Sequence, residues 1–454
     1  MNQERYDEAM RIIDEALIFG INPSLDGIAA MMEKMGNPHT KYPAVQVAGT
    51  NGKTSTVRET AALLRAHGYK TGLYTSPHLV EYPERMEIDG EVADKDLFAD
   101  AVLEAKRVAD ELEDMVITEF ELLTAAAFWA FAQAGIDVAV LECGMGGRWD
   151  ATSIARSDVA VVTGIGLDHL GVLGNTQEEI AEEKAAIIHE GCKAVLGPGT
   201  QGTLQVFARR ASEVGVQPWL VRGTADADAM QAGDAGIDAA GYVTYDCGYG
   251  AEPGTISVDV KGIYGEYDGI VMHAPLYQAQ NISTAIAAAE SYVGRALDAS
   301  KVRDTMAAFG IPGRFETLCT NPMLIIDAAH NPQSALNLAT AVARKFPEGD
   351  FQLLLAVLAD KDARGIIEAL AGLTPDIAVT QTDSPRALTR FELADMVEEL
   401  TGTRPEIFET PALALEELML RQVNTIASGS ITLAGEVKGA WLARQAANGT
   451  RSFL

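Results

Sequence analysis

The chain has 454 residues, 48% of them apolar, and a formal net charge of −29 at pH 7. So acidic a composition excludes nucleic acid as a partner, because phosphate backbones bind to basic surfaces. The sequence has no apolar run long enough to span a bilayer, and its first residues, MNQERYDEAM, lack the apolar stretch of a signal peptide. We therefore expect a cytoplasmic protein with no membrane partner.

Short apolar runs alternate with helical stretches along the chain, which indicates an α/β fold with a mostly parallel sheet. Gly68 and Gly135 are typical helix ends. In the first half of the chain the pattern predicts helices at 53–67 and 119–133 and strands at 44–48, 70–75, 137–141 and 158–162.

The stretch from about 222 to 268 is rich in Gly, Asp and Tyr and alternates like an exposed β-segment, so we expect an antiparallel insertion there. With a linker at 295–300, the expected organisation is an N-terminal domain of residues 1–298 and a smaller C-terminal domain of residues 299–454. Strands of the second α/β series are expected at 323–326, 352–357, 376–380 and 431–434.

The stretch GTNGKTST at 49–56 follows the first predicted strand and begins the first of these helices. Backbone N–H groups at a helix start attract an anion, the Lys53 amine can reach terminal phosphates, and Thr54 can bind Mg²⁺. The other interpretation is a tight turn with an incidental lysine. Val47 occupies the position of the first glycine in the usual phosphate-binding loop, so the loop is of an unusual form.

Further motifs follow in order along the chain. They are GNP at 36–38, TSPHL at 75–79, ERMEIDG at 84–90, FELLTAAAFWAF at 120–131, LECGMGGRWDATS at 141–153, GLDHLGVLG at 166–174, EEKAAII at 182–188, PGRFE at 312–316, DAAHNP at 327–332, DKD at 360–362, SPRA at 384–387 and SITLAGE at 430–436. Together with the loop they cover nearly the whole chain, which resembles the folylpolyglutamate synthase/dihydrofolate synthase family of the Mur ligase superfamily. The resemblance implies a P-loop ATPase domain followed by a Rossmann-like glutamate ligase domain.

The resemblance implies that ATP is bound by residues of both domains. The residues are Thr50, Asn51, Gly52, Lys53, Thr54, Ser55, Asn281, Arg314, Asp327 and His330. The family usually has His-Gln where this chain has Tyr277-Gln278, and Gly where it has Ala328.

Glu142 ends an apolar strand beside the predicted loop, where a carboxylate is well placed to hold Mg²⁺, although a solvated strand end is the alternative. The resemblance implies two Mg²⁺ sites, one held by Ser76 and Glu142 and the other by Glu142 and His169. It further implies that Lys184 is carbamylated and serves the second site. From the sequence alone, His169 could be a surface or core residue, and Lys184 a salt-bridged helix lysine. Lys53, Glu142, His169 and Lys184 are thus the predicted catalytic residues.

The resemblance also implies a pterin pocket and a glutamate site. The expected pterin or folate contacts are Arg85, Thr118, Phe120, Asp150 and Ala151; by composition alone Phe120 would be a core residue. Trp149 and Ser153 depart from the family pattern beside this pocket. Ser384 and Arg386 are candidates for binding glutamate.

The implied reaction is ATP-dependent ligation of L-glutamate to dihydropteroate, to the glutamyl tail of a folate, or to both, through an acyl phosphate. Bifunctional activity is favoured, and a monomer is expected. One rival is another Mur-type ligase acting on a UDP-linked precursor, but those enzymes carry an extra N-terminal domain, for which a loop beginning at residue 49 leaves no room. The other rival is a P-loop NTPase regulatory module, which does not explain a second domain carrying DAAHNP and SPRA.

Overall fold

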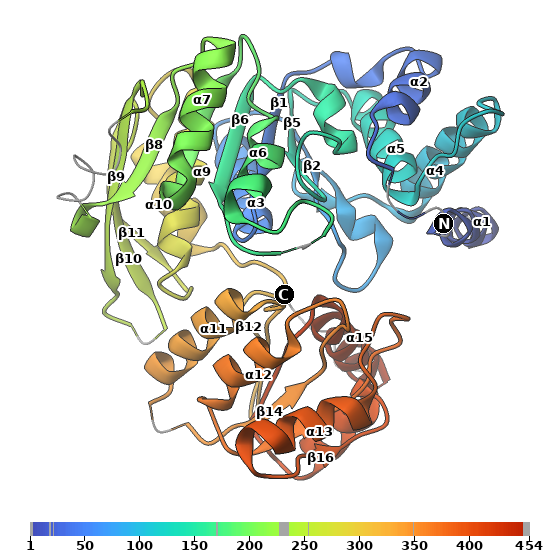
Figure 1. The fold of residues 1–454 in the computed structure, drawn as a ribbon, viewed down its shortest axis with the longest axis vertical. Coiled ribbons are helices and arrows are strands. Elements are labelled where there is room, and N and C mark those ends of the chain that lie inside the picture. Colours follow the sequence, from blue (N-terminus) through green and yellow to red (C-terminus); the bar gives the residue numbers. More distant parts are fainter. Residues whose placement is uncertain are drawn as a thin grey trace.

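The computed structural model describes residues 3–17, 20, 22–168, 171–226, 236–252, 254–347 and 349–447. Figure 1 shows two α/β units, one coloured blue to yellow and the other orange to red, each with helices around a sheet. This arrangement confirms the fold class predicted from the sequence. No helix in the described ranges is both long and apolar enough to cross a membrane.

One large sheet forms the centre of the first unit. Its strands are β1 (Ala44–Ala48), β2 (Thr71–Tyr74), β3 (Met86–Ile88), β4 (Glu91–Val92), β5 (Val138–Glu142), β6 (Val159–Gly164), β7 (Lys193–Gly199), β8 (Trp219–Gly223), β9 (Gly241–Tyr249), β10 (Ile256–Lys261) and β11 (Glu266–Met272). They lie in the order β11-β10-β9-β8-β7-β6-β1-β5-β2-β3-β4. The seven strands β9-β8-β7-β6-β1-β5-β2, taken in their order in the sheet, are each parallel to their neighbours, as the alternation of strands and helices predicts.

Helices cover both faces of this sheet. Successive residues of a strand point to opposite sides, and in β1 the residues on both sides are buried. In β1, Val45 and Val47 pack with the helices of one face, whereas Ala44 and Ala48 pack with those of the other. The first face carries α3 (Lys53–Ala66), α9 (Gln278–Val293) and α10 (Ala299–Ala307), and the second carries α1 (Gln3–Ala16), α2 (Asp26–Lys34), α4 (Lys95–Asp110), α5 (Glu119–Ala134), α6 (Gln177–Ala185) and α7 (Leu204–Val214).

The segment expected to be an antiparallel insertion belongs to the same sheet. β9, β10 and β11 are antiparallel to one another, as expected, but β9 pairs in parallel with β8 and so extends the sheet at its edge. β11 also continues to Met272, beyond the expected range. This pairing joins two separate segments of the chain, so periodicity along the sequence carries no information about it. Residues 227–235 of the segment lie outside the described residues.

The second unit has a smaller sheet with helices on both faces. Its strands are β12 (Glu316–Thr320), β13 (Met323–Ile326), β14 (Gln352–Leu355), β15 (Ile377–Val379), β16 (Glu406–Ile407) and β17 (Thr425–Ser428), in the order β12-β13-β17-β14-β15-β16. One face carries α11 (Pro332–Lys345), α12 (Ala363–Ala371) and α13 (Arg390–Thr401), and the other carries α14 (Pro411–Leu420) and α15 (Ile431–Ala447). The one antiparallel pair in this described sheet is β12 with β13.

The strand predicted at 431–434 is wrong, because these residues form the first turn of α15. The last strand of the second sheet is β17, which ends at Ser428. The chain then turns at Gly429, whose φ is +111°, and the Ser430 hydroxyl accepts the N–H of Leu433 at the start of the helix. The apolar run ITLA is too short for its period to separate a strand from a helix.

The change from one sheet to the other falls between α10 and β12. Val302 and Met306 of α10 pack in the same core as Val45 and Val47 of the first sheet. The segment 295–300 contains the N-cap of α10, Asp298, whose carboxylate accepts the N–H of Ser300 at 2.8 Å. The domain boundary at residue 298 stays a prediction, although α10 lies with the first sheet.

Candidate active site

The predicted phosphate-binding loop joins the end of β1 to the start of α3. Gly52 has a φ of +87° and directly precedes the helix. A Cβ atom at Gly52 would lie 2.5 Å from Asn281 Oδ1, and one at Gly49 would overlap the Thr163 hydroxyl. The loop therefore packs so closely against β6 and α9 that its two glycines are required, whereas Val47 belongs to the strand.

Lys53 lies over this loop. Its amine donates hydrogen bonds to the carbonyl oxygens of Gly49, at 3.0 Å, and Thr50, at 3.3 Å. The N-terminus of α3 and the Lys53 charge thus point toward the same space, which makes it suitable for an anion.

Glu142 is held directly beside the loop, because Val47 and Glu142 are paired residues in β1 and β5. Its carboxylate accepts the Thr54 hydroxyl at 2.8 Å and the Ser76 N–H at 3.3 Å. Burial raises the pKa of Glu142, and the nearby Lys53 opposes this shift. A hydroxyl and a buried carboxylate are the hard oxygen ligands that Mg²⁺ prefers, so these residues fit the predicted metal.

Lys184 of α6 is a buried neighbour of the same loop. Its amine donates to the Gly49 carbonyl oxygen at 3.0 Å. Burial, followed by the Lys53 charge, lowers the pKa of Lys184 to about 7. A large fraction of this amine is therefore neutral near physiological pH, which is the form that reacts with CO₂. This environment fits the predicted carbamylation, and the partner of the amine is a backbone carbonyl oxygen, whereas the alternative of a salt-bridged helix lysine requires a carboxylate.

His169 is the one predicted metal ligand that lies outside the described residues, so its place in the site stays a prediction. Within those residues, no group of three or more His, Cys, Asp and Glu side chains could hold a metal ion. The predicted sites differ from such a group, because they also draw on Ser76, Thr54 and a modified Lys184.

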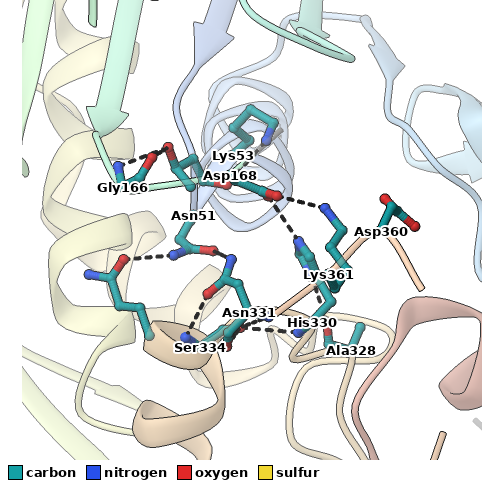
Figure 2. Close-up of polar contacts among 12 residues, drawn as sticks. Asn51, Lys53, Gly166, Asp168, Ala328, His330, Asn331, Ser334, Asp360 and Lys361 are labelled. Carbon is teal, nitrogen blue, oxygen red and sulfur yellow. Dashed lines mark hydrogen bonds and ion pairs between the residues drawn. The ribbon is translucent and has the colours of Figure 1, made fainter. Parts of the chain in front are cut away.

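Residues of the second unit meet the loop directly. The Asn51 amide donates to Gln333 Oε1 at 2.9 Å, and Asn331 donates to Asn51 Oδ1 at 3.1 Å. Figure 2 shows that Asp168 points to two side chains of the second unit, Lys361 at 2.6 Å and His330 at 3.6 Å.

Sequence reasoning assigned no role to Asp168, Lys361, Asn331 or Gln333. Asp168 and Lys361 occur in the motifs GLDHLGVLG and DKD, and these motifs were the signal by which the sequence could have marked the two residues as functional. Their contact, however, joins positions 193 residues apart. Only the placement of one unit against the other reveals it.

The remaining predicted ATP residues lie around the same loop. Asn281 donates to Gln278, which in turn donates to the Ser55 hydroxyl at 3.3 Å. Asp327 accepts the N–H groups of Phe315 and Ala329 at 2.7 and 2.8 Å, so its carboxylate supports the segment that carries Arg314. Burial raises the pKa of Asp327, and Arg314 opposes the shift.

Residues predicted to bind the pterin lie beside β5. The Phe120 ring packs against Gly144, where a Cβ atom would lie 2.6 Å from it. Arg85 forms an ion pair with Glu119 at 3.0 Å, and its Nε donates to His78 Nδ1 at 3.1 Å. Burial and the Arg85 charge lower the pKa of His78 to about 3, so His78 is neutral near pH 7.

The other three residues of this set have structural contacts. Thr118 caps α5 in a reciprocal hydrogen-bonded pair with Glu121. Asp150 accepts the N–H groups of Met145, at 2.9 Å, and Thr152, at 3.0 Å, while Ala151 is buried in the core. Their roles in substrate binding stay predictions.

A cavity of about 1250 Å³ lies at the phosphate-binding loop, and the five residues predicted to bind the pterin are not among the described residues that line it. Its walls come from both units and include Lys53, Glu142, Lys184, Arg314 and His330. Ser384 and Arg386, the candidates for binding glutamate, line it as well. The cavity is large enough for ATP and a second substrate together.

Two family models match the chain on either side of this cavity. Residues 47–196 match the Mur ligase middle domain, and residues 313–430 match the Mur ligase, glutamate ligase domain. A dihydrofolate synthase/folylpolyglutamate synthase of Mycobacterium tuberculosis is 38% identical over 394 residues, which are 82% of this chain and 77% of that protein. This chain belongs to the dihydrofolate synthase/folylpolyglutamate synthase family.

Other members of the family support the same assignment. The protein of that name from Escherichia coli is 32% identical over 377 residues, 83% of this chain and 81% of its own length. A probable bifunctional folylpolyglutamate synthase/dihydropteroate synthase of Haloferax volcanii is 33% identical over 444 residues, 96% of this chain but 50% of that longer protein.

Solved structures of the family share the whole fold. The M. tuberculosis folylpolyglutamate synthase complexed with ADP has a TM-score of 0.86 and 32% identity, over 96% of this chain and 98% of that one. E. coli FolC in complex with DHPP and ADP has a TM-score of 0.81 and 28% identity, over 97% and 98%. Each of these family members therefore has both units, as this chain does.

Proposed function

We propose that this chain is an ATP-dependent ligase that joins L-glutamate to dihydropteroate and to the glutamyl tail of tetrahydrofolate. The observation that carries the proposal is the cavity between the units, in which Lys53, Glu142 and Lys184 surround one phosphate-binding loop. Family membership supports it, since the relatives are named for these two activities.

The proposed reaction has two steps. The substrate carboxylate attacks the γ-phosphorus of ATP, forming an acyl phosphate and releasing ADP. The amine of glutamate then attacks the acyl carbon and loses a proton, and phosphate leaves as the amide forms. Phosphorylation is needed because a carboxylate has no adequate leaving group.

The chain would contribute mainly position and charge to these steps. The backbone N–H groups at the start of α3 and the Lys53 amine would bind the phosphates, and Arg314 would approach them from the second unit. Closure of the cavity between the units would exclude water, which competes with glutamate for the acyl phosphate.

Thr54, Ser76, Glu142 and His169 would hold Mg²⁺, together with a carbamylated Lys184. The ions would neutralise charge on the phosphates when bound. Burial of Glu142 and the lowered pKa of Lys184 support this assignment.

The proposal includes a cytoplasmic monomer whose partners are its small-molecule substrates: ATP, L-glutamate and dihydropteroate or a folate. A cytoplasmic location is supported by the use of ATP. Light scattering during gel filtration tests the monomer.

Mass spectrometry of the products tests the activity. The purified protein is incubated with ATP, Mg²⁺ and L-glutamate, with dihydropteroate in one sample and tetrahydrofolate in another. Addition of glutamate in both samples is expected. Addition in only one would reduce the proposal to a single activity, and addition in neither, with ATP bound, would overturn it.

A further inference from the structure

The loop from Ser76 to Glu84, between β2 and β3, is held at both ends. At its start, the Ser76 N–H donates to Glu142 beside the phosphate-binding loop. At its end, the Glu84 carboxylate accepts the N–H groups of Leu79, at 2.9 Å, Val80, at 3.1 Å, and Glu81, at 3.0 Å. Three charge-assisted hydrogen bonds to one carboxylate fix the backbone at Leu79.

Leu79 reaches from this loop into the second unit. Its side chain packs against the core cluster formed by α14, α15 and the second sheet. A Cβ atom at Gly313 would lie 3.0 Å from Leu79 Cδ1, and one at Gly435 would overlap the Leu79 carbonyl oxygen. Gly313 and Gly435 thus form a socket for Leu79, and any side chain at Gly435 would displace the loop or the unit.

Gly435 lies inside α15, where glycine is a poor choice for the helix itself. Alanine has a much higher helix propensity, and a helical backbone does not need the conformational freedom of glycine. The close approach of the Leu79 carbonyl supplies the reason for glycine at this position.

We propose that Leu79 and its socket fix the position of the second unit against the phosphate-binding loop, so that Leu79 and Gly435 are positioning residues for the ligation. Gly313 directly precedes Arg314, which lines the cavity. The socket therefore connects the Ser76–Glu142 end of the loop with the cation of the second unit. This inference rests on the proposed function, because it assigns these residues to the same reaction.

The variant Gly435→Ala tests the socket, with Gly372→Ala as the matched control. Gly372 ends α12 in the same unit with a helical φ of −66°, and a Cβ atom there would lie 3.9 Å from the Ala369 carbonyl oxygen, an ordinary contact. Each variant adds one methyl group to a glycine of helical conformation. Gly435→Ala is expected to lower kcat by about 100-fold, because a displacement near 1 Å is enough for such a loss. The KM values for ATP and glutamate should change far less, since each substrate's own contacts remain.

The control should retain the wild-type kcat, and both variants should remain folded, as circular dichroism and a cooperative melting transition show. Equal kcat values for Gly435→Ala and Gly372→Ala would overturn the inference. If Gly435→Ala does not fold, Leu79→Ala decides, because it empties the socket without a clash. A fall in kcat of about tenfold in a protein that still melts cooperatively is then expected, and a wild-type kcat would overturn the inference.

A second measurement separates this inference from the proposed function. Spin labels placed on the two units report the distance between them without any substrate. Gly435→Ala should change this distance relative to Gly372→Ala even if the wild-type protein ligates neither substrate. An inactive wild type would overturn the proposed function, whereas identical distances in the two variants would overturn the socket.

Discussion

The amine of Lys184 donates a hydrogen bond to the carbonyl oxygen of Gly49, 3.0 Å away. The buried lysine therefore touches the phosphate-binding loop and also lines the cavity. Lys53 binds the same carbonyl oxygen, also at 3.0 Å. Burial lowers the pKa of Lys184, and the nearby positive charge of Lys53 lowers it further, because two positive charges at one carbonyl oxygen repel each other.

We predict that Lys184 takes up CO₂ as the pH rises through about 7, the value to which its pKa is lowered. Above that pH the amine is neutral and can form a carbamate. Carbon-13 NMR with labelled bicarbonate should show a carbamate signal that grows from pH 6 to pH 8 and is absent in Lys184→Ala. A small carboxylate should partly restore the activity of that variant. Full activity of Lys184→Ala without one would contradict the prediction.

The lowered pKa of Lys184 also makes the free energy of unfolding depend on pH. Between the pKa of about 7 and the ordinary value of 10.5, the unfolded protein binds more protons at Lys184 than the folded protein does. The contribution of Lys184 to the free energy of unfolding is thus most unfavourable below pH 7 and improves as the pH rises toward 10.5. Denaturant unfolding without CO₂ should show this slope, and Lys184→Met should remove it.

Lys53→Ala should abolish ATP-dependent turnover and leave the fold intact. Removing a cation that meets the transferred phosphoryl group should lower kcat by about 10²- to 10³-fold. The matched control is Lys41→Ala, which changes an exposed lysine before β1. Steady-state kinetics and thermal melting of both variants check the result. Wild-type turnover in Lys53→Ala would contradict the assignment of the loop.

Glu142→Gln should raise the Mg²⁺ concentration needed for half-maximal activity. An amide keeps the shape of the side chain but loses the charge that holds the ion, so an increase of about tenfold or more is expected. His169→Ala should also raise the requirement or abolish activity. Glu178→Gln, at an exposed position of α6, is the control. Titration of Mg²⁺ after treatment with a chelator provides the measurement, and an unchanged response would remove the residue from the metal site.

Glu59 of α3 is another buried carboxyl group, and neither of its oxygens has a hydrogen-bond partner among the described residues. Burial raises its pKa well above 4.5. The folded protein therefore binds more protons than the unfolded protein above pH 4.5, and the contribution of Glu59 becomes more unfavourable as the pH rises.

Glu59→Met should stabilise the protein by about 1–3 kcal/mol at pH 8, because it removes an unsatisfied buried group. The gain should shrink toward pH 4.5. Denaturant unfolding at both pH values measures it, with Glu178→Met as an exposed control. A loss of stability at pH 8 would show that Glu59 has a partner in the folded protein.

The ion pair between Asp168 and Lys361 should stabilise the contact between the two units. Both side chains are only 10% exposed, and the two atoms lie 2.6 Å apart. A double-mutant cycle with Asp168→Asn and Lys361→Met should give a coupling energy of about 1–3 kcal/mol. The exposed pair Arg364–Glu399 should give less than about 1 kcal/mol. Equal coupling energies for the two pairs would contradict the prediction.

Local patterns in the sequence predicted most of the elements around the site. The apolar run at 44–48 is β1 without a change of bounds, and the run at 323–326 is β13. Such runs are buried on both faces of a parallel sheet, so their composition alone marks them. The strand predicted at 431–434 failed because a run of four apolar residues fits a strand or the first turn of a helix equally well.

The sequence by itself determined the fold class and the family, because these depend on short motifs and on local periodicity. GTNGKTS specifies a turn into a helix through the backbone needs of two glycines and the charge of one lysine. The tertiary structure alone decided that Asp168 faces Lys361 and His330, that Lys184 donates to Gly49, and that Leu79 enters a socket at Gly435. These contacts join segments far apart in the chain, and their geometry depends on how whole sheets and helices pack, which periodicity along one segment does not encode.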